Sequence, residues 1–192
     1  MRQDIALLAR PASPTRCARL MRRTALFVLA CLCVTSAAPA QEASSAEVEA
    51  RFLLQLVRYV TWPEAVLPAS APIVVGVVGD DAFAATLRRL AAEHKGQDRA
   101  VEVRVVADAT TPGLHLLFVR GGDPSALREL ARVVYSNPVL TVSDRFDFPK
   151  LGGDVGIERV GERVSFSINR RKSVRGDLVI SSKLLRLASE VK

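Results

Sequence analysis

Residues 47–63 have the hydrophobic pattern of one amphipathic helix. Apolar side chains recur at steps of four, at Val48, Phe52, Leu56 and Val60. Charged and amide side chains occupy the opposite side, as the 3.6-residue period of an α-helix requires. The pattern predicts a helix that packs one face on a sheet.

Local signals place the ends of this helix. Ser44 and Glu47 have the spacing of a capping box, which satisfies free amides at a helix start. Pro63 disfavours helical geometry at Trp62. We therefore expect the helix to begin near Ser44 and to end at the Trp-Pro corner.

Four strands are predicted in the next part of the chain. Three apolar runs rich in β-branched residues are typical of strands buried on both faces, and they cover 73–78, 114–119 and 138–142. Valines alternate with charged residues over 101–105, which predicts a half-exposed strand near an edge of the sheet.

Two helices separate these strands. Asp80 is a good N-cap for a helix from Asp81 to about Ala92, with Phe83 and Leu87 on its buried side. A second helix is expected to start at Pro124, since proline is compatible with a first helical turn. The resulting order of strands and helices predicts a mostly parallel α/β sheet with helices on its faces.

The last third of the chain has another pattern. Alternating residues on either side of Gly161 predict an antiparallel β-hairpin. A short strand over 178–180 and a final helix follow, and the apolar residues of that helix are Leu184, Leu185, Leu187 and Ala188. The predicted fold class is a single α/β domain: a mostly parallel sheet flanked by helices, then a C-terminal hairpin and helix.

Residues 1–40 have the features of a secretory signal peptide. A basic segment at 21–23 precedes an apolar run, and Ala38-Pro39-Ala40 matches the small-x-small cleavage pattern. Met21 is an alternative translation start, and Cys31 would be the modified residue if the chain were a lipoprotein. The apolar run is too short to span a bilayer, so residues 41–192 are predicted to form one exported domain that does not cross the membrane.

Removal of this segment changes the charge of the protein. Six of the 27 Lys and Arg residues and one of the 20 acidic residues precede Gln41, so the formal net charge falls from +7 to +2. A nearly neutral domain gives no argument for nucleic acid binding. All three cysteines also lie before Gln41, which removes thiolate catalysis and zinc-thiolate sites from the exported domain.

The sequence offers little catalytic chemistry. His115 lies in an apolar strand, where a core imidazole is expected, and His94 lies at a helix end; neither has a partner at metal-ligand spacing. Asp80 and Asp81 follow a buried strand, where α/β folds place ligand contacts, although capping also explains Asp80. We predict no catalytic residues, no metal and no cofactor, and we retain Asp80 and Asp81 as ligand-contact candidates.

Two further segments allow either a structural or a binding role. Arg170, Arg171, Lys172 and Arg175 form a basic cluster that is either a solvated helix face or a contact for anionic lipid or an acidic protein. The aromatic residues of the 146–149 loop either fold onto the domain or form a docking patch.

Several motifs together resemble the YfiR family of small periplasmic proteins. The matching stretches run in order from about Ala46 to Ala188: Tyr59–Pro63, Ile73–Asp80, His115–Val119, Val139–Ser143, Gly152-Gly153, Arg163–Asn169 and Leu178–Leu185. The resemblance implies an exported, non-enzymatic regulator that binds the periplasmic part of an inner-membrane diguanylate cyclase. Binding would hold the cyclase inactive and lower cyclic di-GMP and biofilm formation, and family members are dimers.

The chain departs from the family pattern in two places. Leu54-Gln55-Leu56 stands where relatives often carry Tyr-Asn-Phe, and the cysteine pairs that make some relatives redox-responsive have no counterpart after residue 40. Redox control is therefore not expected here, and the partner need not be the same one.

The leading hypothesis is a periplasmic repressor that acts by protein contact, with a homodimer expected. The candidate partner contacts are Phe148, Glu158, Ile168 and Lys183. Tyr59 and Trp62 either pack in the core or line a dimer contact. The alternatives are a periplasmic small-ligand-binding accessory protein, which could partner a membrane sensor kinase, and an enzyme that uses carboxylates.

Overall fold

The computed structural model describes residues 38–93, 99–161, 163–170 and 177–192, with side chains from Ser45 onward. The chain divides after Ala40, and Gln41–Lys192 form one compact unit. Residues 1–37 of the predicted signal peptide, His94 and most of the basic cluster lie outside the described residues.

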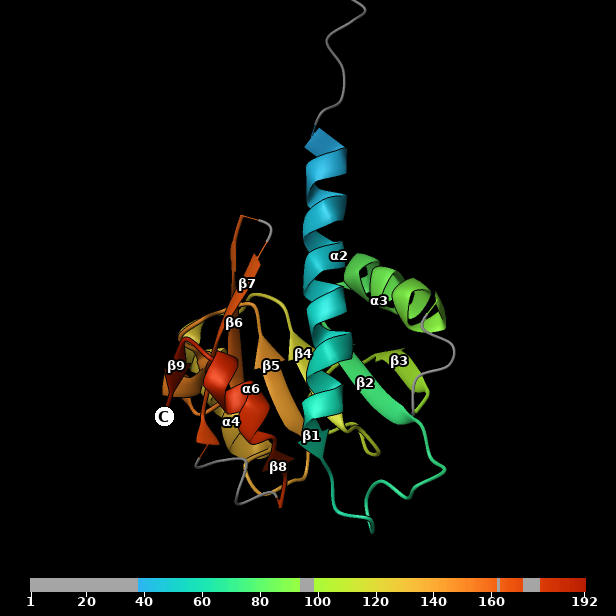
Figure 1. Ribbon diagram of the computed structural model, residues 1–192. Helices are drawn as coiled ribbons and strands as arrows, with labels where there is room; N and C mark the ends of the chain where they lie inside the picture. Colours follow the sequence, from blue (N-terminus) through green and yellow to red (C-terminus); the bar gives the residue numbers. More distant parts are fainter. Residues whose placement is uncertain (1–37, 94–98, 162, 171–176) are drawn as a thin grey trace, which may run out of the picture. The chain divides into compact units, whose positions relative to one another are not determined.

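The described elements follow one another as predicted for an α/β chain (Figure 1). The helices are α2 (Ala38–Leu56), α3 (Asp81–Glu93), α4 (Pro124–Val133) and α6 (Ser182–Leu187), with 3-10 turns η1 (Val57–Tyr59) and η2 (Phe148–Leu151). The strands are β1 (Val60–Thr61), β2 (Ile73–Val78), β3 (Val101–Val105), β4 (Leu116–Val119), β5 (Leu140–Ser143), β6 (Val155–Val160), β7 (Arg163–Ile168), β8 (Val179–Ile180) and β9 (Glu190–Val191).

Seven of the described strands form the main sheet, in the order β3-β2-β4-β5-β6-β7-β9. Strands β3 to β6 pair in parallel, and β6 and β7 form the antiparallel hairpin. This confirms the predicted fold class. Strand β3 is an edge strand, as the alternation of its residues indicated.

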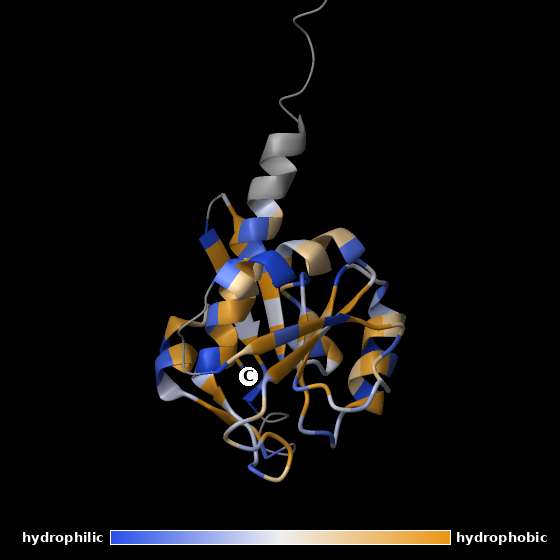
Figure 2. Cartoon of the chain, turned by 90° about the vertical axis from the view of Figure 1, so that its right-hand side faces the viewer, coloured by the Kyte–Doolittle hydropathy of each residue, from blue (hydrophilic) through white to orange (hydrophobic). Residues whose placement is uncertain are grey.

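Helices cover both faces of the sheet. Helices α2, α3 and α6 contribute to one apolar core, with Leu53, Leu87 and Leu184 packed beside strand residues such as Phe118. Helix α4 and η2 contribute to a second, smaller core on the other face, with Leu127 beside strand residues such as Leu117. Strand residues alternate between the two cores, because successive side chains of a strand point to opposite faces. Figure 2 shows the resulting concentration of hydrophobic residues in the strands.

The topology has a switch point between β2 and β4. The connection through α3 leads from β2 outward to β3, whereas the connection through α4 leads from β4 in the other direction to β5. Crossovers of one hand that run in opposite directions place their helices on opposite faces. The two cores follow from this order of strands.

The first helix differs from its prediction at both ends. It begins at Ala38, so Ser44 lies within the helix and is not its N-cap. It gives way to η1 after Leu56, and the backbone of Val60 is already extended. Val60 and Thr61 form β1, which pairs with β8, so strand pairing ends the helix before the Trp-Pro corner does.

The C-terminal end also differs in two details. Ala188 was expected within the final helix, but Leu187, which is 66% exposed, is the last residue of α6. Helix α6 ends there, since Ala188 has an extended backbone. The chain then forms β9, a strand that the sequence did not predict, which pairs in parallel with β7.

Candidate functional site

The carboxyl ends of β2, β4 and β5 bring one arginine and three carboxylates together. Arg120 follows β4, Asp80 follows β2, Asp144 follows β5, and Glu49 reaches the group from α2. In open α/β sheets ligands bind at this edge, beside the switch point. These four residues, named the Arg120 cluster below, are therefore the first candidate for a site.

Each carboxylate has a defined contact with the guanidinium of Arg120. Its Nε lies 2.8 Å from Asp80 Oδ2, and one terminal nitrogen lies 3.8 Å from Asp144 Oδ2. The other terminal nitrogen donates to Glu49 Oε2. The guanidinium carbon also lies 4.7 Å from the centroid of the Phe83 ring and 5.5 Å from that of Phe118, within the range of cation–π attraction.

Two of the carboxylates are also tied to the backbone. Asp80 Oδ1 accepts a 2.7 Å hydrogen bond from Phe83 N–H, which confirms Asp80 as the cap of α3. Asp144 Oδ1 accepts one of 2.8 Å from Gly121 N–H. The cluster therefore joins α2, α3 and the ends of three strands, and its polar groups bind one another.

This arrangement changes the interpretation of Asp80 and Asp81. Asp80 serves as a cap and an ion-pair partner, and Asp81 is exposed in the first turn of α3. Ligand contact by either residue stays a prediction. Within the described residues, no group of three or more His, Cys, Asp or Glu side chains is placed to hold a metal ion.

The sequence analysis missed Arg120 and Glu49. Arg120 stands directly after an apolar strand, at the edge where Asp80 and Asp144 also emerge. That shared edge was the available signal, since the carboxyl ends of parallel strands meet there. Glu49 gave no such signal, because its contact depends on where α2 crosses the sheet.

The four predicted partner contacts fall into two classes. Phe148 and Ile168 are both 0% exposed, whereas Glu158 and Lys183 lie at the surface. The loop around Phe148 folds onto the domain: a Cβ added to Gly153 would lie 2.2 Å from the Phe148 ring. The glycine is thus required for this close packing. The structure does not bring the four side chains together into one exposed patch.

Loop 144–153 is further held by a buried carboxylate that the sequence analysis did not single out. Asp154 is 0% exposed, and its Oδ2 accepts hydrogen bonds from Thr141 N–H at 2.8 Å and from Thr141 Oγ1 at 2.6 Å. Because a buried carboxylate needs such donors, Asp154 has a structural explanation. It fixes the start of β6 against β5.

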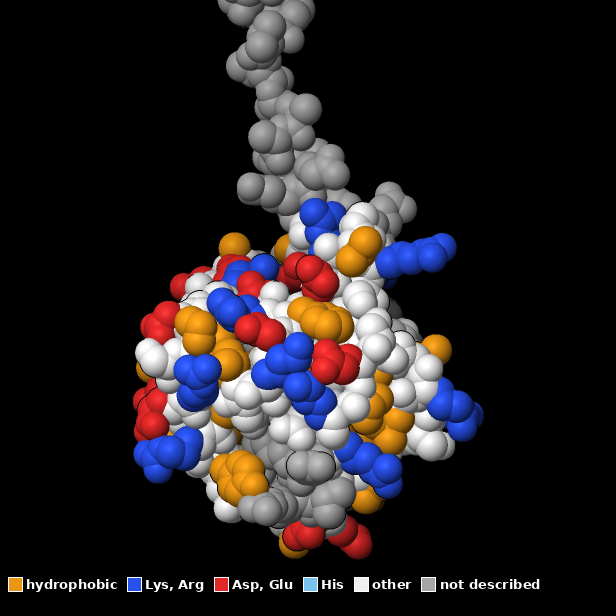
Figure 3. Space-filling view, turned by 90° about the vertical axis from the view of Figure 1, so that its left-hand side faces the viewer, with side chains coloured by type: hydrophobic (Ala, Val, Ile, Leu, Met, Phe, Trp, Pro, Cys, Tyr) orange, Lys and Arg blue, Asp and Glu red, His pale blue; other side chains and the backbone are white. Residues whose placement is uncertain are grey.

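The hairpin divides into a buried and an exposed half. Val155 and Ile157 belong to the main core, while Glu158, Arg159 and Val160 are exposed, with Val160 at 61%. Figure 1 shows this end of the hairpin extending beyond the neighbouring strands. Figure 3 shows the side of the domain on which β9 lies in Figure 1; hydrophobic side chains form small areas there among acidic and basic ones.

Trp62 and His115 form a buried polar pair at the end of β1. Trp62 Nε1 donates a 3.0 Å hydrogen bond to the His115 carbonyl oxygen, and Trp62 is only 6% exposed. His115 Nδ1 accepts from Val74 N–H at 2.9 Å, and its Nε2 lies 3.3 Å from Val66 O. The expected core histidine is confirmed, and both of its ring nitrogens have polar contacts.

The surroundings of His115 lower its pKa. Burial is the largest cause, and the positive charges of Arg99 and Arg104 act in the same direction, while the contact with Val66 O opposes them. The neutral imidazole is favoured in the folded state. Trp62 thus packs in the core, Tyr59 is half-buried, and a dimer contact by either residue stays a prediction.

Two of the comparisons with known proteins found matches. A model of the YfiR/HmsC-like family matches residues 46–189. A solved structure described as a conserved domain protein from Vibrio cholerae O1 biovar El Tor str. N16961 is similar in fold, with a TM-score of 0.51 and 12% identity over 74% of this chain and 60% of that one. No curated protein matches. Among the described helices, none has the length and apolar character needed to cross a membrane.

Proposed function

The chain belongs to the YfiR/HmsC-like family, and from this premise we propose that it represses an inner-membrane diguanylate cyclase by direct contact with the periplasmic part of that enzyme. Family membership makes it a periplasmic regulator of cyclic di-GMP signalling in general and places it in a non-catalytic family. The finer steps belong to the proposal: export through the 1–40 segment, contact with one cyclase, and lower biofilm formation.

The family match over residues 46–189 is the observation that carries this proposal. The exposed half of the hairpin supports it, because a protruding β-hairpin offers backbone and side chains to a partner. Glu158 and Val160 supply a charge and an apolar side chain there. Transient interfaces of this kind are about as apolar as the rest of a protein surface, so a large hydrophobic patch is not required.

The surface assignment therefore moves from the predicted four residues to the exposed ones. Glu158 stays a partner contact in the proposal, and Lys183 on α6 is its second charged member. Phe148 and Ile168 are buried and would act indirectly, by holding in place the loop and the hairpin that carry the exposed residues. A homodimer, as the resemblance implies, is part of the same proposal.

Deletion of the gene tests the regulatory role. In a strain that contains the cognate cyclase, cyclic di-GMP measured by mass spectrometry is expected to rise, and re-expression of the protein is expected to restore the original level. An unchanged level in the deletion strain would contradict repression.

Binding to the purified periplasmic domain of that cyclase tests the surface. Val160→Glu and Glu158→Arg are expected to weaken binding at least fivefold in calorimetry. The first places a charge at an apolar position of the hairpin end, and the second reverses a charge there. Val105→Glu is the matched control, because Val105 is also an exposed valine, at 45%, on the edge strand β3 at the other end of the sheet. Equal affinities for all three variants would exclude the hairpin as the surface that binds the cyclase.

A further inference from the structure

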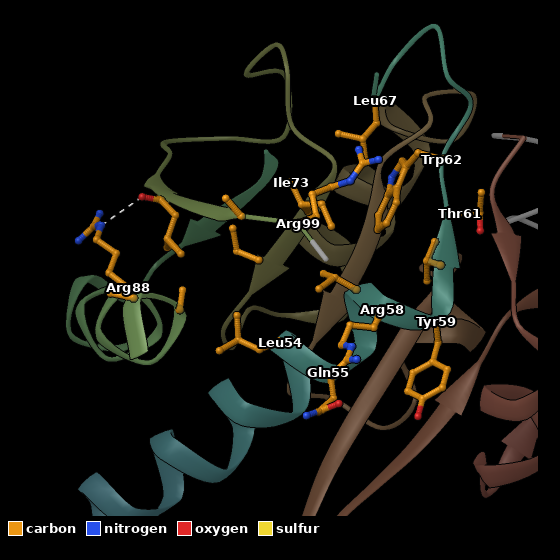
Figure 4. A pocket seen from close by; sticks show the side chains of 17 residues that line it. Leu54, Gln55, Arg58, Tyr59, Thr61, Trp62, Leu67, Ile73, Arg88 and Arg99 are labelled. Atoms are coloured by element: carbon orange, nitrogen blue, oxygen red, sulfur yellow. Dashed lines mark hydrogen bonds between the residues drawn. The ribbon is translucent and has the colours of Figure 1, made fainter. Parts of the chain in front are cut away.

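An open groove of about 920 Å³ lies between the end of α2 and the edge strand β3. Its walls come from α2 and η1, from β1 and the following loop, from the last turns of α3, and from β3 (Figure 4). Leu54, Trp62, Leu67 and Ile73 make much of the lining apolar. A groove of this volume is in the range of small-molecule sites.

Among the described residues that line the groove, the charged ones are three arginines: Arg58, Arg88 and Arg99. No Asp or Glu is found among these described lining residues. Arg99 lies beside Trp62 in the interior, and Arg88 lies on α3 at the rim (Figure 4). The groove is therefore positive as well as apolar.

Neither Arg88 nor Arg99 contacts a carboxylate within the described residues. Arg99 donates to the carbonyl oxygens of Pro68 at 2.9 Å and of Ala71 at 3.5 Å. Arg88 Nε donates to Val103 O at 3.1 Å. These bonds use one nitrogen of each guanidinium and hold it in place without neutralising its charge.

The nearby carboxylates are engaged with other arginines. Glu93, in the last turn of α3, lies 2.9 Å from Arg89, and Glu102 of β3 lies 2.8 Å from Arg104. Helix α3 and strand β3 therefore carry acidic residues, but these residues pair with arginines that do not line the groove. A guanidinium fixed by carbonyl oxygens, with donors left over, is suited to bind an anionic group of a ligand.

We propose that this groove binds a small amphipathic anion, a molecule with one carboxylate head and an apolar chain. The carboxylate pairs with Arg99, with Arg88 adding positive charge at the rim, and the chain lies against Trp62, Leu54 and Leu67. The proposal goes beyond repression by protein contact, since it concerns another surface and a small ligand.

Trp62 provides a direct probe, because it is the single tryptophan of the chain and lines the groove. Decanoate, kept below its micelle concentration, is added to the exported protein purified from the periplasm. A saturable change in tryptophan fluorescence is expected, with an affinity at least tenfold higher than that of decanol, which has the same chain without the charge.

Variants at one exposed position separate charge from shape. Ala92→Glu places a carboxylate in the groove and is expected to weaken decanoate binding about tenfold or more, whereas Ala92→Gln, of nearly equal size, is expected to weaken it less than threefold. Arg99→Gln is expected to weaken it about tenfold, as loss of a charged hydrogen bond does. Arg132→Gln is the matched control, because Arg132 pairs with Glu129 on α4 and does not line this groove.

Each outcome of these binding measurements either supports or overturns the proposed anion site. Tight decanoate binding that falls with Ala92→Glu and Arg99→Gln, but not with Ala92→Gln or Arg132→Gln, supports the site. Absence of a saturable response to decanoate, equal affinity for decanol, or equal loss in the two Ala92 variants would overturn it. Circular dichroism spectra of all variants verify that they are folded.

Discussion

The Arg120 cluster and the α2–β3 groove both contain fixed arginines, but they differ in what surrounds the charge. Arg120 contacts three carboxylates and lies over two aromatic rings. Arg99, in the groove, is held by backbone carbonyl oxygens and contacts no carboxylate among the described residues. The first arginine is neutralised by the protein, and the second retains its charge for another molecule.

This difference shows that position in a fold does not by itself identify a site. The cluster occupies the strand-end edge where α/β proteins bind ligands, yet its groups bind one another and join α2 to the sheet. The groove lies beside an edge strand, where no general rule places a site, but it combines volume, apolar walls and two arginines, Arg88 and Arg99, that contact no carboxylate among the described residues. Local chemistry is the better guide here.

Removal of Arg120 is expected to have the largest effect on stability. Arg120→Met leaves Glu49, Asp80 and Asp144 close together without their shared cation. Breaking a buried ion pair costs about 3–5 kcal/mol, and because the Arg120 side chain is 28% exposed we expect about 2–4 kcal/mol. Urea unfolding at pH 7 measures this loss.

The groove arginines provide the contrast for that experiment. Arg88→Gln combined with Arg99→Gln removes two guanidinium groups that neutralise no carboxylate among the described residues. Their bonds to carbonyl oxygens lie near the surface, where water can replace the lost donors, so we expect a change of about 1 kcal/mol or less. A loss as large as that of Arg120→Met would mean that the two regions do not differ as described. No loss with Arg120→Met would equally contradict the structural role of the cluster.

The wall of the groove should show an intermediate effect. Trp62→Phe keeps most of the apolar ring but leaves the buried His115 carbonyl oxygen without its 3.0 Å hydrogen bond from Trp62 Nε1. The His115 carbonyl oxygen keeps its 2.9 Å hydrogen bond from Leu140 N–H, so we expect the net cost of one lost hydrogen bond, about 0.5–1.5 kcal/mol. Urea unfolding, monitored by circular dichroism, measures this loss in the free energy of unfolding. An unchanged midpoint would show that the bond from Trp62 Nε1 does not hold the Trp-Pro corner in place.

How much the sequence could predict depends on how far apart in the chain the contacting residues lie. Buried strands, the cap of α3 and the hairpin were found because each depends on residues close together in the chain: Asp80 caps α3 through the backbone amide three residues later. The end of α2 was misplaced because β1 pairs with β8, and Val60 lies opposite Ile180. Helical periodicity continues through Val60, but pairing with a distant strand outweighs it.

The candidate sites depend even more on distant contacts. The sequence placed Phe148 and Ile168 on a partner surface, whereas packing against Gly153 and the main core buries them. Arg99 drew no attention in the sequence, since its contacts with Pro68 and Ala71 come from a loop about thirty residues earlier. Both outcomes follow from tertiary contacts that no local pattern encodes.

Acid should weaken the groove wall through His115, and this is the smallest effect that we predict. Burial lowers the pKa of His115 in the folded protein, with Arg99 and Arg104 acting in the same direction, below the value of 6.5 expected when the chain unfolds. The unfolded state then binds a proton more readily than the folded state does. The contribution of His115 to the free energy of unfolding is therefore fully present above pH 6.5 and is lost as the pH falls through the pKa of His115 in the folded protein.

The variant His115→Asn isolates this contribution, because its amide oxygen can take the place of Nδ1 and accept from Val74 N–H without titrating. Urea midpoints of both proteins are measured from pH 8 to pH 5. We expect the advantage of the wild-type protein to shrink below pH 6.5, because a protonated Nδ1 can no longer accept that bond and the cation faces Arg99 and Arg104. Parallel curves would show that His115 stays neutral throughout, and that the groove wall does not respond to acid.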